Sequence, residues 1–121
     1  MPVREHLVAL RTVADTVYLD HKIRNYILDL VGATREPRAA GLADLAELIA
    51  FGASPRASLY LARAAKAMAL VRGRGYVIPE DVKEVAADVL RHRIIPTYEA
   101  EAEEVSSETL VTRLLERIEV P

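Results

Sequence analysis

The chain has 121 residues, of which 51% are hydrophobic and only 5% aromatic, and its formal net charge is −2. It contains no cysteine, which excludes disulfides, thiolate metal sites and cysteine nucleophiles. No apolar run reaches the roughly 20 residues that span a bilayer, and the N-terminus lacks the apolar stretch of a secretion signal. The sequence therefore predicts a single domain, or part of a larger protein, in the cytoplasm.

The first half of the chain shows apolar residues at helical spacing. We expect a helix over residues 3–14, within an N-terminal helix or linker that occupies residues 1–16. An extended stretch at 16–19 follows, and Asp20 then caps a helix over 20–35. A loop at 36–41 leads to a short helix over 42–49.

The second half begins with an alanine-rich helix over about 55–72, whose small side chains let neighbouring helices approach closely. A glycine turn at 73–75 and an extended stretch at 76–78 follow. Pro79 opens a helix over 79–91. After an acidic mobile loop over 99–108, Ser106 or Ser107 caps a final helix over 107–118. About five helices predict an all-α bundle, in which the two extended stretches can pair as a minimal two-strand bridge.

Charge is unevenly distributed along the chain. Residues 56–93 carry a surplus of +4, and residues 94–121 carry −5. The cationic middle segment suits phosphate or an acidic partner. Its surplus is smaller than a nucleic-acid-binding domain would need, so nucleic acid is not the predicted partner.

The hexapeptide Gly52–Ala57 leads directly into the alanine-rich helix. Ser54 suits the N-cap and Pro55 suits the first helical position. Arg56 is out of place, because a cation in the first turn opposes the helix dipole at a cost of about 0.3–1 kcal/mol. Either Arg56 is a solvated surface residue, or it and free backbone N–H groups bind an anion such as phosphate. Arg63 lies on the same predicted helix face.

The sequence contains no complete catalytic set. It has no phosphate-binding Gly-x-x-x-x-Gly-Lys-Ser/Thr loop and no serine in a nucleophile elbow. The histidines, His6, His21 and His92, are too far apart for a metal site. We therefore predict neither catalysis by this chain alone nor a bound metal.

Five motifs of the chain, in order and spacing, resemble the C-terminal lid of MoxR-type AAA+ ATPases. They are Gly52–Ala57, Arg72-Gly73-Arg74 with Tyr76-Val77, Pro79-Glu80-Asp81-Val82, Val89-Leu90-Arg91-His92-Arg93, and Tyr26-Ile27 with Ala33-Thr34-Arg35. The resemblance runs from about Val17 to Val120. It implies that residues 17–121 are a helical lid that follows an ATPase core missing from this chain.

The resemblance also implies a role for Arg56. In that family the arginine of the Ser-Pro-Arg motif is the sensor 2 residue, which reaches the γ-phosphate of ATP from the lid side. Ser54 and Pro55 would set the helix start and aim Arg56, and Gly52 would let the chain turn closely there. ATP with Mg²⁺ is expected in the full-length protein, and no cofactor is expected on this chain alone.

The resemblance implies further partners. Six basic residues could contact the core domain or a neighbouring subunit in a ring, or form a solvated face: Arg63, Arg72, Arg74, Arg91, His92 and Arg93. MoxR-type ATPases resemble chaperones that mature protein complexes, often with von Willebrand A-domain partners, so a client complex is expected.

Two other functions are compatible with the residues. The chain could be a stand-alone helical module that binds protein or DNA through its basic middle segment and uses no nucleotide. Residues 107–118 could lie on a membrane surface, but two acids and two arginines on so short a helix favour ordinary core packing.

Overall fold

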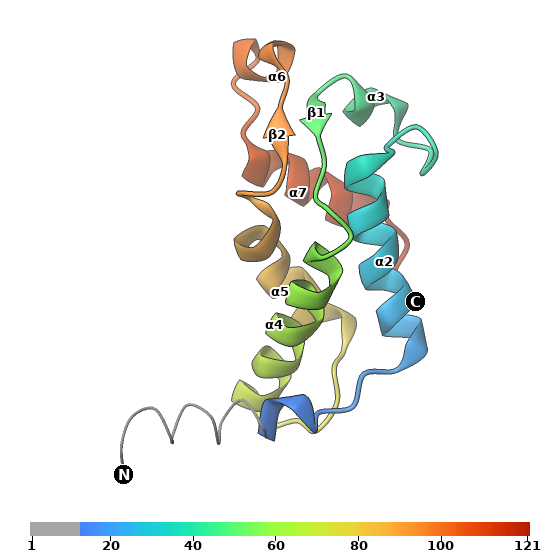
Figure 1. The fold of residues 1–121 in the computed structure, drawn as a ribbon, viewed down its shortest axis with the longest axis vertical. Helices are drawn as coiled ribbons and strands as arrows, with labels where there is room; N and C mark the ends of the chain where they lie inside the picture. The colour runs from blue at the N-terminus through green and yellow to red at the C-terminus, as the bar shows by residue number, and fades with distance from the viewer. Residues whose placement is uncertain (1–12) are drawn as a thin grey trace, which may run out of the picture.

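The computed structural model describes residues 13–121. Most of the predicted helix over 3–14 lies outside these residues, and residues 13–15 are helical. Four longer helices build the body of the fold (Figure 1): α2 (His21–Arg35), α4 (Ala57–Val71), α5 (Pro79–Leu90) and α7 (Ser107–Arg117). The all-α bundle predicted from the sequence is thereby confirmed.

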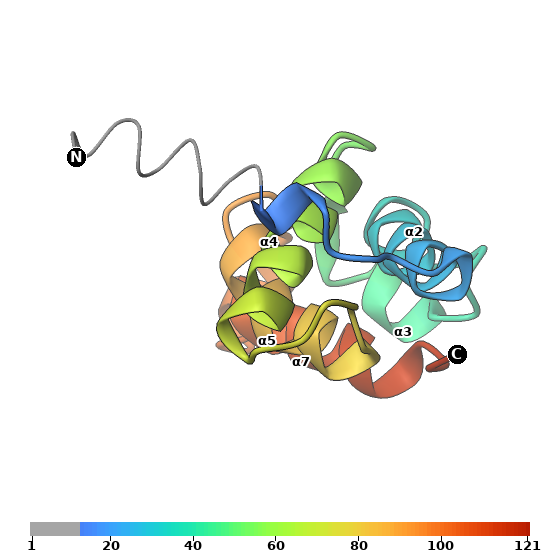
Figure 2. The ribbon, with the colours of Figure 1, turned by 90° about the horizontal axis from the view of Figure 1, so that it is seen from below.

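The four helices pack around one core. α4 and α5 lie side by side, α2 packs on α4, and α7 contacts both α5 and α2 (Figures 1 and 2). The inner face of α4 consists of Ala57, Leu61, Ala65 and Ala69, all fully buried. These four residues recur every four positions, and the three alanines among them let α5 approach closely, as the sequence predicts.

The predicted bridge between the two extended stretches is confirmed. Tyr18 and Tyr76 form an isolated parallel bridge. The N–H of Tyr18 donates to the carbonyl of Gly75 at 2.8 Å, and the N–H of Val77 donates to the carbonyl of Tyr18 at 3.0 Å. This bridge ties the segment before α2 to the turn between α4 and α5.

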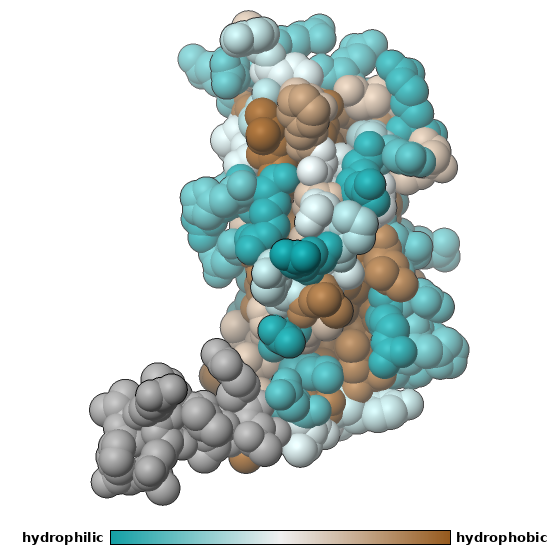
Figure 3. All heavy atoms as spheres, viewed as in Figure 1, coloured by the Kyte–Doolittle hydropathy of each residue, from teal (hydrophilic) through white to brown (hydrophobic). Residues whose placement is uncertain are grey.

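A second pairing was not predicted. Short strands β1 (Ile49–Phe51) and β2 (Ile95–Pro96) form an antiparallel two-stranded sheet. The predicted short helix over 42–49 is reduced to α3 (Ala43–Ala46), because Ile49 belongs to β1. Figure 3 shows apolar side chains at the surface near this sheet, where Phe51 and Ile95 are exposed.

The prediction of a mobile acidic loop over 99–108 is wrong for its first part. Residues Tyr98–Ala102 form α6, which Thr97 caps by accepting the N–H of Ala100 at 3.1 Å. The predicted cap of the last helix is confirmed, since Ser106 accepts the N–H of Thr109 at 3.2 Å. Asp20 stands at the N-cap of α2, but its side chain makes no capping hydrogen bond.

The hydroxyl of Tyr26 is unusual because it is buried in the core without a hydrogen-bond partner among the described residues. The side chain is 2% exposed, and its hydroxyl has no hydrogen-bond partner among residues 13–121. Burial, with a smaller contribution from the charge of Glu80, raises the pKa of Tyr26. A buried polar group without a partner lowers stability, so the hydroxyl costs free energy in the folded state.

Tyr26→Phe is therefore expected to unfold at the same urea concentration as the wild type at pH 8, or at a higher one. Because the folded-state pKa lies above the unfolded value of about 10, the unfolded chain loses its proton first and stability falls as the pH rises through 10. Tyr26→Phe lacks this loss, so its free energy of unfolding exceeds that of the wild type by more at pH 10.5 than at pH 8. A loss of about 1 kcal/mol at pH 8 would show instead that the hydroxyl has a stabilising partner.

None of the helices within residues 13–121 is long and apolar enough to cross a membrane. The cytoplasmic location stays a prediction.

Candidate functional site

The hexapeptide Gly52–Ala57 is anchored to the end of α2. Thr34, in the last turn of α2, is fully buried, and its hydroxyl accepts the N–H of Ala53 at 3.0 Å. The same hydroxyl donates to the carbonyl of Val31 at 2.6 Å. Ala53 is itself buried, so its backbone is held by a partner inside the protein rather than by water.

Gly52 lies against the backbone of α2. A Cβ atom built on Gly52 would lie 2.0 Å from the carbonyl oxygen of Thr34 and 2.6 Å from the nitrogen of Arg35. Only glycine fits so close to another stretch of backbone. The resemblance implies a close turn of the chain at Gly52, and the structure shows at this residue a close approach to the last turn of α2.

The start of α4 differs from the prediction. The helix begins at Ala57, two residues after Pro55, and Arg56 occupies the N-cap in a helical conformation. Within residues 13–121 the Ser54 hydroxyl accepts no N–H from the first turn; instead, the Ser54 backbone carbonyl accepts the N–H of Ala57 at 2.9 Å. A tight turn that contains Pro55 therefore begins the helix, in place of the side-chain cap that the sequence predicts.

This turn also removes most of the free N–H groups expected at the helix end. The N–H of Ser58 donates to the carbonyl of Pro55 at 3.1 Å, and that of Leu59 donates to the carbonyl of Arg56 at 3.1 Å. The backbone of the first turn is therefore largely satisfied. An anion at this end of α4 would depend on the Arg56 side chain.

Arg56 is exposed, and its side chain forms no hydrogen bond or ion pair with residues 13–121. An internal carboxylate would have neutralised it, but none of those in residues 13–121 forms an ion pair with it. Its guanidinium presents hydrogen-bond donors in a planar fork that matches carboxylate or phosphate. The site thus offers an unneutralised cation on a backbone that the end of α2 holds in place.

Arg93 adds a second cation near the start of α4, where it lies over the ring of Tyr60. Tyr60 lies one turn after Arg56 on α4, and the Arg93 guanidinium stacks over its ring at 4.9 Å from the centroid. Arg93 Nη1 also donates to the carbonyl of Val89 at 2.6 Å. Arg63, three residues after Tyr60, is likewise exposed. Arg56, Tyr60 and Arg63 are therefore all exposed, and Arg93 reaches Tyr60 from the turn that follows α5.

Three of the other basic candidates form internal ion pairs. Arg72 pairs with Glu84, and Arg74 pairs with Asp81. Asp81 is 1% exposed and also accepts the N–H of Ile78 at 2.9 Å, so this pair holds the start of α5.

Arg91 likewise pairs with Asp88 and, at 2.7 Å, with Glu108 at the start of α7. Together with the pairs of Arg72 and Arg74, these ion pairs engage three of the eight Lys and Arg side chains of residues 56–93 within the fold. His92 is exposed beside Arg91.

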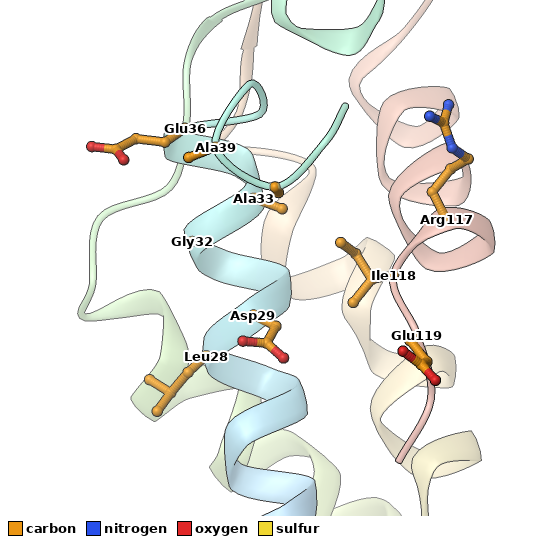
Figure 4. A pocket seen from close by; sticks show the side chains of 10 residues that line it. Leu28, Asp29, Gly32, Ala33, Glu36, Ala39, Arg117, Ile118 and Glu119 are labelled. Atoms are coloured by element: carbon orange, nitrogen blue, oxygen red, sulfur yellow. The ribbon is translucent and has the colours of Figure 1, made fainter. Parts of the chain in front are cut away.

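A hollow beside α2 does not suit an anion. It lies between α2 and the segment after α7, has a volume of about 560 Å³, and is drawn in Figure 4. The carboxylates of Asp29 and Glu119 face the space between these two segments. Arg117, at the rim, pairs with Asp44 at 2.9 Å and lowers the pKa of that carboxyl. Negative charge therefore dominates this hollow.

Residues 13–121 bring together no group of three histidine or acidic side chains that could hold a metal ion. Sequence reasoning did not find the role of Thr34, because its bond joins positions 19 residues apart. The resemblance at Ala33-Thr34-Arg35 was a signal there, but it indicated no partner.

Comparison with known proteins gives these features a context. The family described as "AAA lid domain" matches residues 42–114, a range that includes the hexapeptide, α4, α5 and most of α7. The chain belongs to the AAA lid domain family. This match covers more than half of the chain and confirms the lid predicted from its motifs.

Individual relatives show to which type of AAA lid the chain is similar. The chain is 47% identical over 115 residues to "Chaperone MoxR1" of Mycobacterium tuberculosis, covering 95% of this chain and 30% of that protein. It is 47% identical over 87 residues to "Protein MoxR" of Paracoccus denitrificans, covering 67% of this chain and 26% of that protein. The predicted MoxR type is thereby confirmed, and the chain spans about a third or less of each relative.

A solved structure has the same fold. A protein of Cytophaga hutchinsonii assigned as an ATPase superposes with a TM-score of 0.86 at 44% identity, covering 91% of this chain and 33% of that one. The lid fold therefore occurs there as part of a chain about three times as long.

Proposed function

We propose that this AAA lid senses ATP through Arg56. A core domain of the full-length protein holds ATP with Mg²⁺, and the Arg56 guanidinium contacts the γ-phosphate from the lid side. The main support for this proposal comes from Arg56 itself. Its side chain is exposed and forms no ion pair within residues 13–121, and its backbone is held in place through the contacts of Thr34 and Gly52. A cation at a helix start costs free energy unless an anion binds there, and phosphate is such an anion.

The proposal extends to the whole protein. Hydrolysis removes the γ-phosphate and with it one contact between lid and core, so the lid can rotate as a rigid body against the core. In a ring of subunits this motion would act on a client protein complex, including one with von Willebrand A-domain partners. The exposed residues Arg63, His92 and Arg93 are available for contacts with the core or a neighbouring subunit.

The alternative of a DNA-binding module has less support. A duplex is bound through unneutralised Lys and Arg side chains. Arg72, Arg74 and Arg91 instead form ion pairs inside the fold. Within the middle segment, Arg56, Arg63 and Arg93 are exposed and form no ion pair with residues 13–121.

The purified 121-residue chain is expected not to hydrolyse ATP, because its sequence has no phosphate-binding loop to hold the nucleotide. Phosphate release is measured with this chain and, in parallel, with a full-length ATPase that contains it. Activity that appears only in the full-length protein supports a lid that works on ATP held elsewhere. A clear rate from the pure chain, purified by two independent routes, would contradict the proposal.

A further inference from the structure

Thr34 is fully buried, and the proposed function uses it only as a support for the backbone that carries Arg56. It stands at the last turn of α2, far in sequence from the hexapeptide, yet its hydroxyl bonds to the backbone of Ala53. Both of its hydrogen-bond partners are backbone groups, the carbonyl of Val31 and the N–H of Ala53. The hydroxyl therefore fastens the loop before α4 directly to the backbone of α2.

The chain from Ala53 to Arg56 has little freedom. Pro55 has a fixed φ angle, and the carbonyl of Ser54 is bonded to the N–H of Ala57. Ser58 bonds twice to the carbonyl of Pro55, through its N–H at 3.1 Å and its hydroxyl at 2.6 Å. The place of the Arg56 backbone therefore follows from the place of Ala53.

Gly52 adds a second contact at the same point. Its backbone lies so close to the carbonyl of Thr34 that a Cβ would reach within 2.0 Å of the oxygen. The end of α2 thus holds the loop both by a hydrogen bond at Ala53 and by van der Waals contact at Gly52. A shift of α2 would move the start of α4 with it.

We propose that Thr34 is a positioning residue for Arg56: its hydrogen bond to Ala53 sets the direction from which the guanidinium approaches the phosphate. This inference rests on the proposed function, because it presumes that Arg56 contacts ATP. Preorganised geometry matters at such a contact, since a displacement of about 1 Å can cost up to about a hundredfold in rate. Thr34 would act on hydrolysis without touching the nucleotide.

The test is a double-mutant cycle in a full-length ATPase that contains this lid. Thr34→Val keeps the shape of the side chain and removes the hydroxyl, whereas Thr34→Ser keeps the hydroxyl. Each is made with Arg56 present and in the Arg56→Ala background, and kcat and KM for ATP are measured well below the melting temperature. A residue that acts through Arg56 loses its effect once Arg56 is gone.

With Arg56 present, we expect Thr34→Val to lower kcat about fivefold and Thr34→Ser to stay within about twofold of the wild type. In the Arg56→Ala background, Thr34→Val should change kcat by less than about twofold. If Thr34→Val does not fold, Thr34→Ala, which leaves room for a water molecule at the hydroxyl position, is compared in the same two backgrounds.

Equal losses from Thr34→Val in both backgrounds would overturn the positioning role, because general damage to the lid lowers the rate whether or not Arg56 is present. An Arg56→Ala variant with undiminished hydrolysis would instead overturn the proposed function of Arg56. The cycle therefore separates the failure of this inference from the failure of that proposal.

Discussion

Replacing Arg56 by alanine in the full-length ATPase is expected to slow ATP hydrolysis by about 10- to 100-fold. A hydrogen bond to a charged group contributes about 1.5–3 kcal/mol, and each 1.36 kcal/mol of transition-state stabilisation changes a rate tenfold. The free energy of unfolding should stay within about 0.5 kcal/mol of the wild type, because Arg56 is exposed and has no partner within residues 13–121. Its removal also relieves an unfavourable interaction with the helix dipole.

The measurement pairs steady-state hydrolysis with urea unfolding of the same preparation. Arg113→Ala is the matched control, since Arg113 is an exposed helical arginine with no ion pair among the described residues and lies on α7. The control should retain the wild-type rate. Parallel losses of rate and stability in Arg56→Ala would mean that Arg56 supports the fold rather than the reaction.

Gly52→Ala should destabilise the lid by about 3 kcal/mol, near the upper end of the usual cost of overpacking. The new Cβ would lie 2.0 Å from the Thr34 carbonyl oxygen, and this oxygen belongs to helix backbone that cannot swing aside. Relief requires the loop before α4 to move away from α2, which stretches the hydrogen bond at Ala53. For a domain of this size we expect the melting temperature to fall by about 10 °C.

Gly32→Ala provides the contrast within the same helix. Gly32 lies inside α2, and a Cβ built there meets nothing within 4 Å. Alanine is the better helix former, so this variant should gain about 0.5–1 kcal/mol. Thermal unfolding of both variants distinguishes the two positions. If Gly52→Ala were as stable as the wild type, the loop would not be pressed against α2.

The helices were predictable because their signals are local. The apolar stripes of α2, α5 and α7 repeat every three or four residues, and each stripe is buried in the structure. Pro79 and Ser106 mark helix starts through their own backbone and side-chain chemistry. Such features require no knowledge of distant residues.

The features that the sequence did not predict, or predicted wrongly, depend on contacts across the fold. β1 and β2 are three and two residues long, too short to show alternation, and they pair over more than 40 positions. Ser54 has a strong preference for the N-cap, but its carbonyl rather than its hydroxyl receives the N–H of Ala57. A preference of one residue was overridden there by a turn that also includes Pro55.

The candidate site was predicted in part. The sequence singled out Arg56 because a cation is unfavourable at a helix start, and its spacing to Arg63 placed both on one face of α4. It did not indicate that Arg72, Arg74 and Arg91 form internal ion pairs. The pairs of Arg72 with Glu84 and of Arg91 with Glu108 depend on how α4, α5 and α7 pack, since these partners lie 12 and 17 positions away. Net charge along a segment does not tell which cations stay free.

The affinities of the full-length ATPase for ADP and for a slowly hydrolysed ATP analogue, with and without Arg56→Ala, test the central claim most directly. If Arg56 touches the γ-phosphate, the variant should bind the ATP analogue about tenfold or more weakly and bind ADP within about twofold of the wild type. Equal weakening for both nucleotides, or no weakening for either, would contradict a contact between Arg56 and the γ-phosphate.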